Sequence, residues 1–245
     1  MSFASCKRLL SGVLLAALIS SAGAGYASVV AAETCRTATS LAANLGLMRG
    51  HLFVAADLFE AGHFKLAQRH SKHPAEEVYQ ELLPGLAQFE LPGFSPELAA
   101  FADVLAMGEQ GRALFRDGYA QLIATMDALE SQIPLNERQL QRVAFELVSQ
   151  AVVEYAVGVA EDGRVTDLQE YQDAYGFVTI AKGKVVGDAA ETSGAKNSEL
   201  AQAFAAALRL WPTLMPRQPV SSESDDLVQL VALMRQQGMA APACD

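Results

Sequence analysis

Apolar residues recur at three- and four-residue steps along most of the chain after residue 40. The clearest run consists of Leu41, Leu45, Met48, Leu52, Ala55 and Phe59. This spacing marks one face of an α-helix, and Gly62 is a typical helix end. A second run covers the adjoining face: Leu47, His51, Val54 and Leu58. A helix with two apolar faces is expected to be buried on a broad front.

Similar patterns predict further helices. They lie near residues 63–70, 75–89, 96–107, 109–132, 136–160, 167–182, 197–210 and 223–237. Pro74 is expected to open the helix that follows it, and Ser95-Pro96 has the residues of a helix start. The linkers are expected at residues 91–93, 183–196 and 212–219. The predicted fold is all-α, a single-domain helical bundle of about eight helices.

The N-terminus resembles a secretory signal. Lys7 and Arg8 precede an apolar run from Leu9 to Ile19, and small residues follow through Ala32. This order predicts a signal peptide over residues 1–32 and an exported domain over residues 33–245, periplasmic or secreted. The run is shorter than the roughly 20 apolar residues of a spanning helix, so the mature chain is not expected to span a membrane. A buried N-terminal core helix is the alternative.

The net charge of the chain indicates which kinds of partner it can bind. The formal net charge of the chain is −10, and removal of Lys7 and Arg8 with the leader makes it −12. Binding to nucleic acid needs clustered Lys and Arg on the protein. The composition therefore argues against nucleic acid and suits a soluble protein that attracts cations.

Two cysteines would remain after cleavage, Cys35 and Cys244. Because exported proteins meet an oxidising environment, we predict a disulfide between them. Closing so long a loop is worth about 5 kcal/mol in the chain-entropy model. Two free thiols on frayed chain ends are the alternative.

The four histidines gather within 23 residues, at positions 51, 63, 70 and 73. Imidazole together with carboxylate suits transition metals such as iron, copper or zinc. His70 and His73 flank a predicted helix boundary, and carboxylates follow in the next turn. The predicted metal ligands are His51, His70, His73 and Glu77, with Met48 as a soft extra ligand and Glu76 as the alternate carboxylate.

The same residues also fit a structure without metal. Pro74, Glu76 and Glu77 are residues that a helix N-terminus favours for backbone and dipole reasons. His51 could be a hydrogen-bonded core histidine. The alternative function is therefore a metal-free helical interaction or scaffold module with an acidic surface.

Residues 154–178 carry a second motif, two acid–tyrosine helices joined by an Asp-Gly turn. The residues that define it are Glu154, Tyr155, Asp162, Gly163, Glu170 and Tyr171. In these residues the chain resembles the periplasmic N-terminal region of bacterial ferrous-iron permeases. The resemblance implies an exported helical protein that handles iron or a related metal, with a metal-uptake membrane protein or another periplasmic protein as partner.

Other families fit less well. Imelysin-like iron-uptake proteins bear Gly-x-His-x-x-Glu, whereas here Gly50 and His51 are adjacent and Val54 stands in place of the glutamate. No nucleophile elbow, phosphate-binding loop or dinucleotide fingerprint occurs in the sequence. No complete catalytic motif is therefore present, and an enzyme with a metal centre, of unnamed substrate, is the third alternative.

Overall fold

The computed structural model describes residues 14–76, 78–186, 195–222 and 224–244, and for residues 14–28, 73, 75–76 and 195–198 it describes the backbone alone. Within these ranges the chain forms nine α-helices and two short 3-10 helices. The extended pairing described there is one isolated bridge between Val159 and Val165. The predicted all-α class is confirmed.

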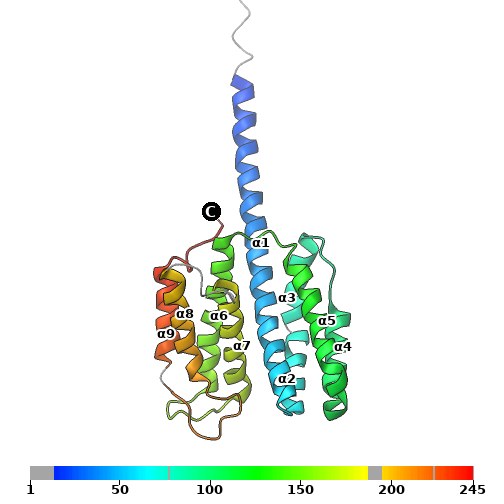
Figure 1. Cartoon of the computed structure of the whole chain (residues 1–245). Helices are drawn as coiled ribbons and strands as arrows, with labels where there is room; N and C mark the ends of the chain where they lie inside the picture. The colour runs from blue at the N-terminus through cyan, green and yellow to red at the C-terminus, as the bar shows by residue number, and fades with distance from the viewer. Residues whose placement is uncertain (1–13, 77, 187–194, 223, 245) are drawn as a thin grey trace, which may run out of the picture.

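The elements, in chain order, are α1 (Leu14–Glu60), α2 (Phe64–Glu76), α3 (Val78–Gln88), α4 (Ser95–Ala106), η1 (Gly108–Gly111), α5 (Arg112–Glu130), α6 (Glu137–Gly158), α7 (Leu168–Val185), α8 (Ala195–Ala207), η2 (Leu208–Leu210) and α9 (Asp225–Gln236). Helix α1 runs along the middle of the molecule, with α2–α5 on one side and α6–α9 on the other (Figure 1). Its first turns stand beyond the ends of the other helices (Figure 1).

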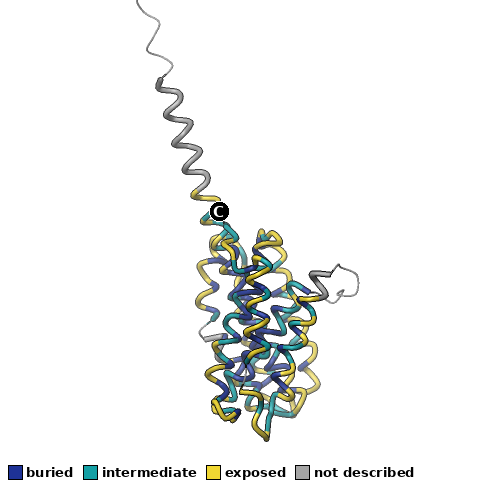
Figure 2. Tube along the Cα trace, turned by 90° about the vertical axis from the view of Figure 1, so that its left-hand side faces the viewer, coloured by how far each residue is buried: buried dark blue, intermediate teal, exposed yellow. Residues whose placement is uncertain are grey.

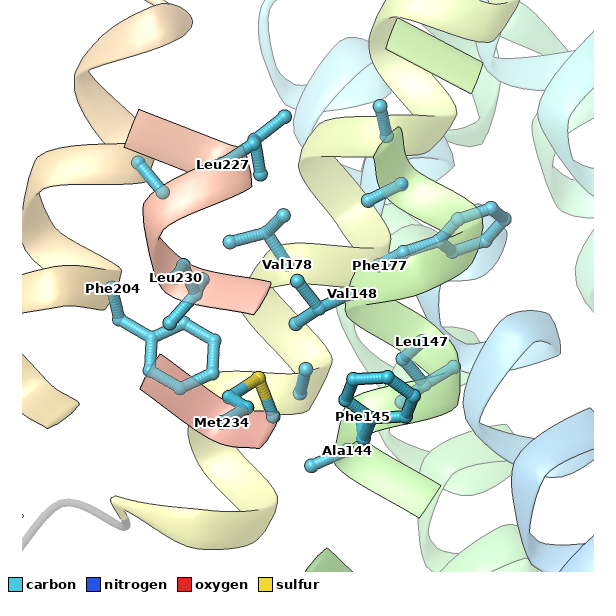
Figure 3. Packing of buried hydrophobic residues seen from close by; sticks show 14 of the residues in the cluster. Ala144, Phe145, Leu147, Val148, Phe177, Val178, Phe204, Leu227, Leu230 and Met234 are labelled. Carbon is cyan, nitrogen blue, oxygen red and sulfur yellow. The ribbon is translucent and has the colours of Figure 1, made fainter. Parts of the chain in front are cut away.

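Two apolar clusters correspond to these two sides. One is built mainly from α6, α7, α8 and α9, and the other from α1 to α5. In the first cluster, side chains such as Val148, Val178 and Leu230 point toward one another from three helices (Figure 3). Buried positions follow the inner sides of the helices (Figure 2). Helix α1 contributes residues to both clusters, including Ala42 to one and Leu45 to the other.

The structure of helix α2 shows that the prediction for Pro74 is wrong. Pro74 does not open a new helix but lies inside α2, close to its end. A proline there forfeits one backbone hydrogen bond, to the carbonyl of residue 70. Burial of Ala67, His70, Ser71 and Pro74, which share one helical face, offsets that loss. The helix end predicted near Gly62 is present, and the two helices on either side of it, α1 and α2, pack together.

The second predicted linker, residues 183–196, is also shorter than expected. Helix α7 continues to Val185 and α8 begins at Ala195, so residues 183–185 and 195–196 are helical rather than loop. Lys182 and Lys184 in the last turn of α7 favour this extension, because cations stabilise the C-terminal end of a helix.

The disulfide predicted between Cys35 and Cys244 is present, with a Cα–Cα distance of 5.6 Å. It joins α1 to the segment that follows α9. The predicted cleavage position after Ala32 lies within α1. None of the described helices combines the length and the apolar character that a bilayer crossing requires.

Candidate metal centre

Two glycines allow α1 and α7 to approach closely. A methyl group on Gly176 would meet the carbonyl oxygen of Gly50 at 2.4 Å, and one on Gly50 would meet the Phe177 ring at 2.5 Å. The residue after Gly50 is His51, whose ring packs edge-on against Phe177 with centroids 5.1 Å apart. The close approach thereby directs His51 toward α7.

His51, His70 and Asp173 meet where α1, α2 and α7 come together. Asp173 Oδ1 lies 2.6 Å from His51 Nδ1 and 2.9 Å from His70 Nδ1. All three residues are buried, and His70 and Asp173 are each 1% exposed. One ligand atom from each residue lies within 4.8 Å of the others, so the three could hold a metal ion.

Gln172 completes the surroundings of His70. Its Nε2 donates to the carbonyl of Leu214 at 2.8 Å, and a carbonyl can only accept. The amide oxygen therefore faces His70 Nε2, at 2.7 Å. Because that oxygen can only accept, the Nε2 of His70 carries a proton.

Asp173 is ionised in this setting. Burial raises the pKa of this carboxyl, but hydrogen bonds and charge interactions with His51 and His70 outweigh burial and lower the pKa from 3.8 to about 2. An ionised carboxylate accepts only, so both facing Nδ1 atoms have to donate. Both nitrogens of His70 therefore face acceptors, Nδ1 the Asp173 carboxylate and Nε2 the Gln172 amide oxygen.

The sequence-predicted ligands divide into three groups. His51 and His70 come together as expected. Met48 is fully buried among the apolar side chains of α1–α5. His73, Glu76 and Glu77 lie outside the described residues, either wholly or in their side chains, and stay predictions.

The sequence analysis missed Asp173. It lies 122 residues from His51 and 103 from His70, too far apart to be recognised by spacing. A signal was nevertheless present. In α7 the polar pair Gln172-Asp173 sits between Tyr171 and Ala174, which belong to the apolar core. Two polar residues inside an apolar stretch of helix need buried partners.

The tyrosines of the permease-like motif form hydrogen bonds to the loop between α8 and α9. Tyr155 donates its hydroxyl hydrogen to the Ser221 carbonyl at 2.6 Å, and Tyr171 donates to the Thr213 carbonyl at 2.9 Å. Burial raises the pKa of Tyr155 to about 12, so its hydroxyl stays protonated and able to donate. Both tyrosines hold the segment between α8 and α9 against α6 and α7.

The turn of that motif is also structural. Gly163 has a positive φ of 80°, and its carbonyl accepts from Val220 N at 2.9 Å. A methyl group on Gly163 would meet the Val220 carbonyl oxygen at 2.4 Å. The Asp-Gly turn therefore packs directly on the same loop that the tyrosines hold.

The two glutamates of the motif pair with each other. Burial raises the pKa of Glu170 to about 8, helped by a hydrogen bond with Glu154 and by the negative charges of Glu154, Asp173 and Asp167. Gln150 in turn donates to Glu154. At neutral pH the pair therefore shares a proton between α6 and α7, one turn of α7 away from Asp173.

The fold and this centre define a helical bundle with a buried cluster of three side chains that could hold a metal ion. Residues 122–241 match the protein family described as the iron permease-associated 4-helix bundle domain. The resemblance to iron permeases predicted from residues 154–178 is thus confirmed, over a longer stretch that includes α6 to α9. No curated protein and no solved structure matches the chain.

The matched segment supplies only part of the centre. Asp173 and Gln172 lie on α7 inside it, whereas His51 and His70 lie on α1 and α2 outside it. The candidate centre is therefore built across the boundary between the matched and the unmatched parts of the chain.

Proposed function

We propose that this protein is exported and that it binds a divalent transition-metal ion at His51, His70 and Asp173 as an accessory of an iron permease. The iron-permease-associated domain supports the relation to iron handling. Two imidazole nitrogens with one carboxylate oxygen form a donor set that suits ferrous iron, zinc or copper. With iron as cargo, the ion is the substrate of the protein rather than a resident cofactor.

The observation that carries the proposal is the charge arrangement around Asp173. One carboxylate oxygen contacts two imidazole Nδ1 atoms at 2.6 and 2.9 Å, and all three residues are buried. Without metal, both Nδ1 atoms face a carboxylate oxygen that only accepts, so each donates a hydrogen there. A divalent cation would take the place of these two hydrogens once both Nδ1 atoms give up their protons, because metal-ligating imidazole nitrogens are unprotonated.

The size of the cluster also fits an ion. Bonds of about 2.0–2.2 Å from nitrogen and oxygen to a metal place two opposite donors up to about 4.4 Å apart. The ligand atoms here lie within 4.8 Å of one another. To bind one ion, the Asp173 oxygen and the two Nδ1 atoms, now 2.6 and 2.9 Å apart, would have to separate to about 3.4 Å, the spacing of tetrahedral donors.

Metal content after native purification tests the proposal. We expect a stoichiometric ion in the wild type and at least a hundredfold weaker binding of ferrous iron, under anaerobic conditions, in His51→Gln, His70→Gln and Asp173→Asn. His63→Gln is the matched control, because it removes an imidazole from the turn between α1 and α2. Equal ion content in the wild type and the His51→Gln/His70→Gln double variant would overturn the metal site and favour a metal-free helical module.

His73→Gln and Glu77→Gln extend this test to the predicted ligands outside the described residues. A loss of affinity in either variant would add that residue to the centre. Export is tested separately, by the mass of the protein recovered from the periplasm or the medium. The expected mature chain begins at Glu33, and recovery of the full-length chain from the cytoplasm alone would contradict export.

The link to a permease has its own measurement. We expect cells that express an iron permease together with this protein to take up ferrous iron faster than cells with the permease alone. The His51→Gln/His70→Gln variant should remove that gain. Equal uptake with and without the protein would contradict the accessory role while leaving metal binding intact.

A further inference from the structure

Gln172 is the most completely bonded polar side chain around the candidate centre, and it is itself 0% exposed. Its amide nitrogen donates to the Leu214 carbonyl at 2.8 Å and lies 3.5 Å from the Met215 sulfur. Its oxygen accepts from His70 Nε2 at 2.7 Å. Both ends of the amide are therefore engaged, and the amide cannot turn over without breaking these contacts.

The loop that receives the amide nitrogen is held in place. Tyr171, next to Gln172 in the sequence, donates to the Thr213 carbonyl at 2.9 Å. The backbone nitrogen of Met215 donates to the Thr213 hydroxyl at 3.1 Å. The Leu214 carbonyl thus has a fixed direction, which sets the direction of the Gln172 amide.

We propose that Gln172 is a positioning residue for the metal centre: it keeps the proton of neutral His70 on Nε2, so that the Nδ1 lone pair is the atom presented to the ion beside Asp173. This inference rests on the proposed function and deepens it. A free imidazole exchanges its proton between the two nitrogens, and an outer hydrogen bond removes that freedom. The carbonyl of Leu214, on a loop between α8 and α9, thereby acts on a ligand that belongs to α2.

The geometry explains why the amide oxygen of Gln172, which accepts from His70 Nε2, matters most for metal binding. If Nε2 lost its acceptor, the ring could place its proton on Nδ1, where it would donate to Asp173 and block the ion. A carboxylate at position 172 would keep the acceptor for Nε2, but it would lose the bond to Leu214 and add a buried negative charge. An aliphatic side chain of similar size would lose both bonds.

Metal affinity of three variants tests this role, with ferrous iron as the probe under anaerobic conditions. We expect Gln172→Leu to bind the ion 10–100-fold more weakly than the wild type, which is the usual effect of losing an outer hydrogen bond to a ligand. Gln172→Glu should bind the ion more tightly than Gln172→Leu, because the acceptor for Nε2 is kept. Equal affinity in Gln172→Leu and the wild type would overturn the proposal.

Gln139→Leu is the matched control for loss of a buried amide. Gln139 is 3% exposed and bonds Thr39, Cys35 and Asn136, away from the candidate ligands. Its loss should lower the melting temperature without changing ion affinity. A fall in affinity equal to that of Gln172→Leu would show that stability alone controls binding, and would refute the positioning role.

Nitrogen-15 NMR of the histidine rings gives a readout that does not depend on metal binding. In the metal-free wild type, the Nε2 of His70 should carry a proton that is hydrogen-bonded to the Gln172 amide oxygen. In Gln172→Leu this pattern should shift toward the other tautomer or a mixture. If no variant binds an ion but this shift is seen, the metal function fails and the positioning by Gln172 stands.

Discussion

The carbonyl oxygen of Gly50 lies against the Cα of Gly176, and no side chain fits between the two helices at that point. Backbone atoms on both sides cannot move aside as a flexible side chain would. The contact sets the distance between α1 and α7, and therefore the distance between His51 and Asp173.

Gly176→Ala should separate these helices. We expect it to lower the free energy of unfolding by about 1–3 kcal/mol, as overpacking of a tight contact does, and to weaken ion binding. Urea denaturation and iron titration measure the two effects. Gly183→Ala on the same helix is the control, since nothing lies within 4 Å of a methyl group there. That variant should gain about 0.5–1 kcal/mol of stability from helix propensity.

Asp173 should stabilise the metal-free protein at neutral pH. Its pKa is lowered from 3.8 to about 2, so its contribution is present above pH 3.8 and is lost as the pH falls through 2. Asp173→Asn should therefore cost on the order of 2 kcal/mol at pH 7 and should lack the loss of stability that the wild type shows between about pH 4 and 2. Unfolding by urea across this range tests it. Asp162→Asn, an exposed position, should change stability little.

Glu170 should have the opposite effect on how stability depends on pH. Its pKa is raised from 4.5 to about 8, so the folded protein keeps a proton that the unfolded chain releases. Its contribution is therefore favourable below pH 4.5 and is lost as the pH rises through 8. Glu170→Gln should remove this dependence and raise stability at pH 9 by on the order of 1 kcal/mol, after allowance for solvent screening at a partly exposed pair.

Melting curves of Glu170→Gln and the wild type between pH 5 and 9 provide the measurement. The two curves should agree at pH 5 and separate as the pH rises. Glu161→Gln, exposed in the neighbouring turn, is the control and should follow the wild type throughout. A constant difference at all pH values would contradict a shared proton between Glu154 and Glu170.

The disulfide should contribute strongly to stability. Cys35 and Cys244 are separated by 209 residues in the sequence. Their replacement by serine in the double variant should lower the free energy of unfolding by about 2–5 kcal/mol. Urea denaturation with and without reductant measures this, since reductant should destabilise the wild type and leave the double variant unchanged. Two thiols labelled by an alkylating reagent in the unreduced protein would contradict the bond.

Local sequence rules predicted the helices because apolar spacing and caps act within a few residues. Asn136, for example, accepts from Gln139 N in a capping box, as its position before an apolar run suggests. The same rules gave a wrong prediction at Pro74. Whether a proline is tolerated inside α2 depends on the burial of its neighbours, and burial is set by tertiary packing, which local rules do not describe.

Sequence reasoning could identify only part of the candidate site. His51 and His70 attract attention because histidine is rare in this chain and the four residues are close together. Asp173 is one of many acidic residues, and its contact with the two histidines depends on how the helices pack. The polar pair Gln172-Asp173 between the apolar residues Tyr171 and Ala174 is visible in the sequence, but the imidazoles that Asp173 contacts are not.

Helix α1 forms a wall of both apolar clusters, and it also carries His51 and Cys35. A fragment limited to residues 122–241 would thus leave Leu147 and Phe177 facing water where α1 now covers them. Such a fragment would also carry a carboxylate with no imidazole opposite. In this chain, the segment that matches the family therefore depends on a helix outside it to cover part of its apolar surface.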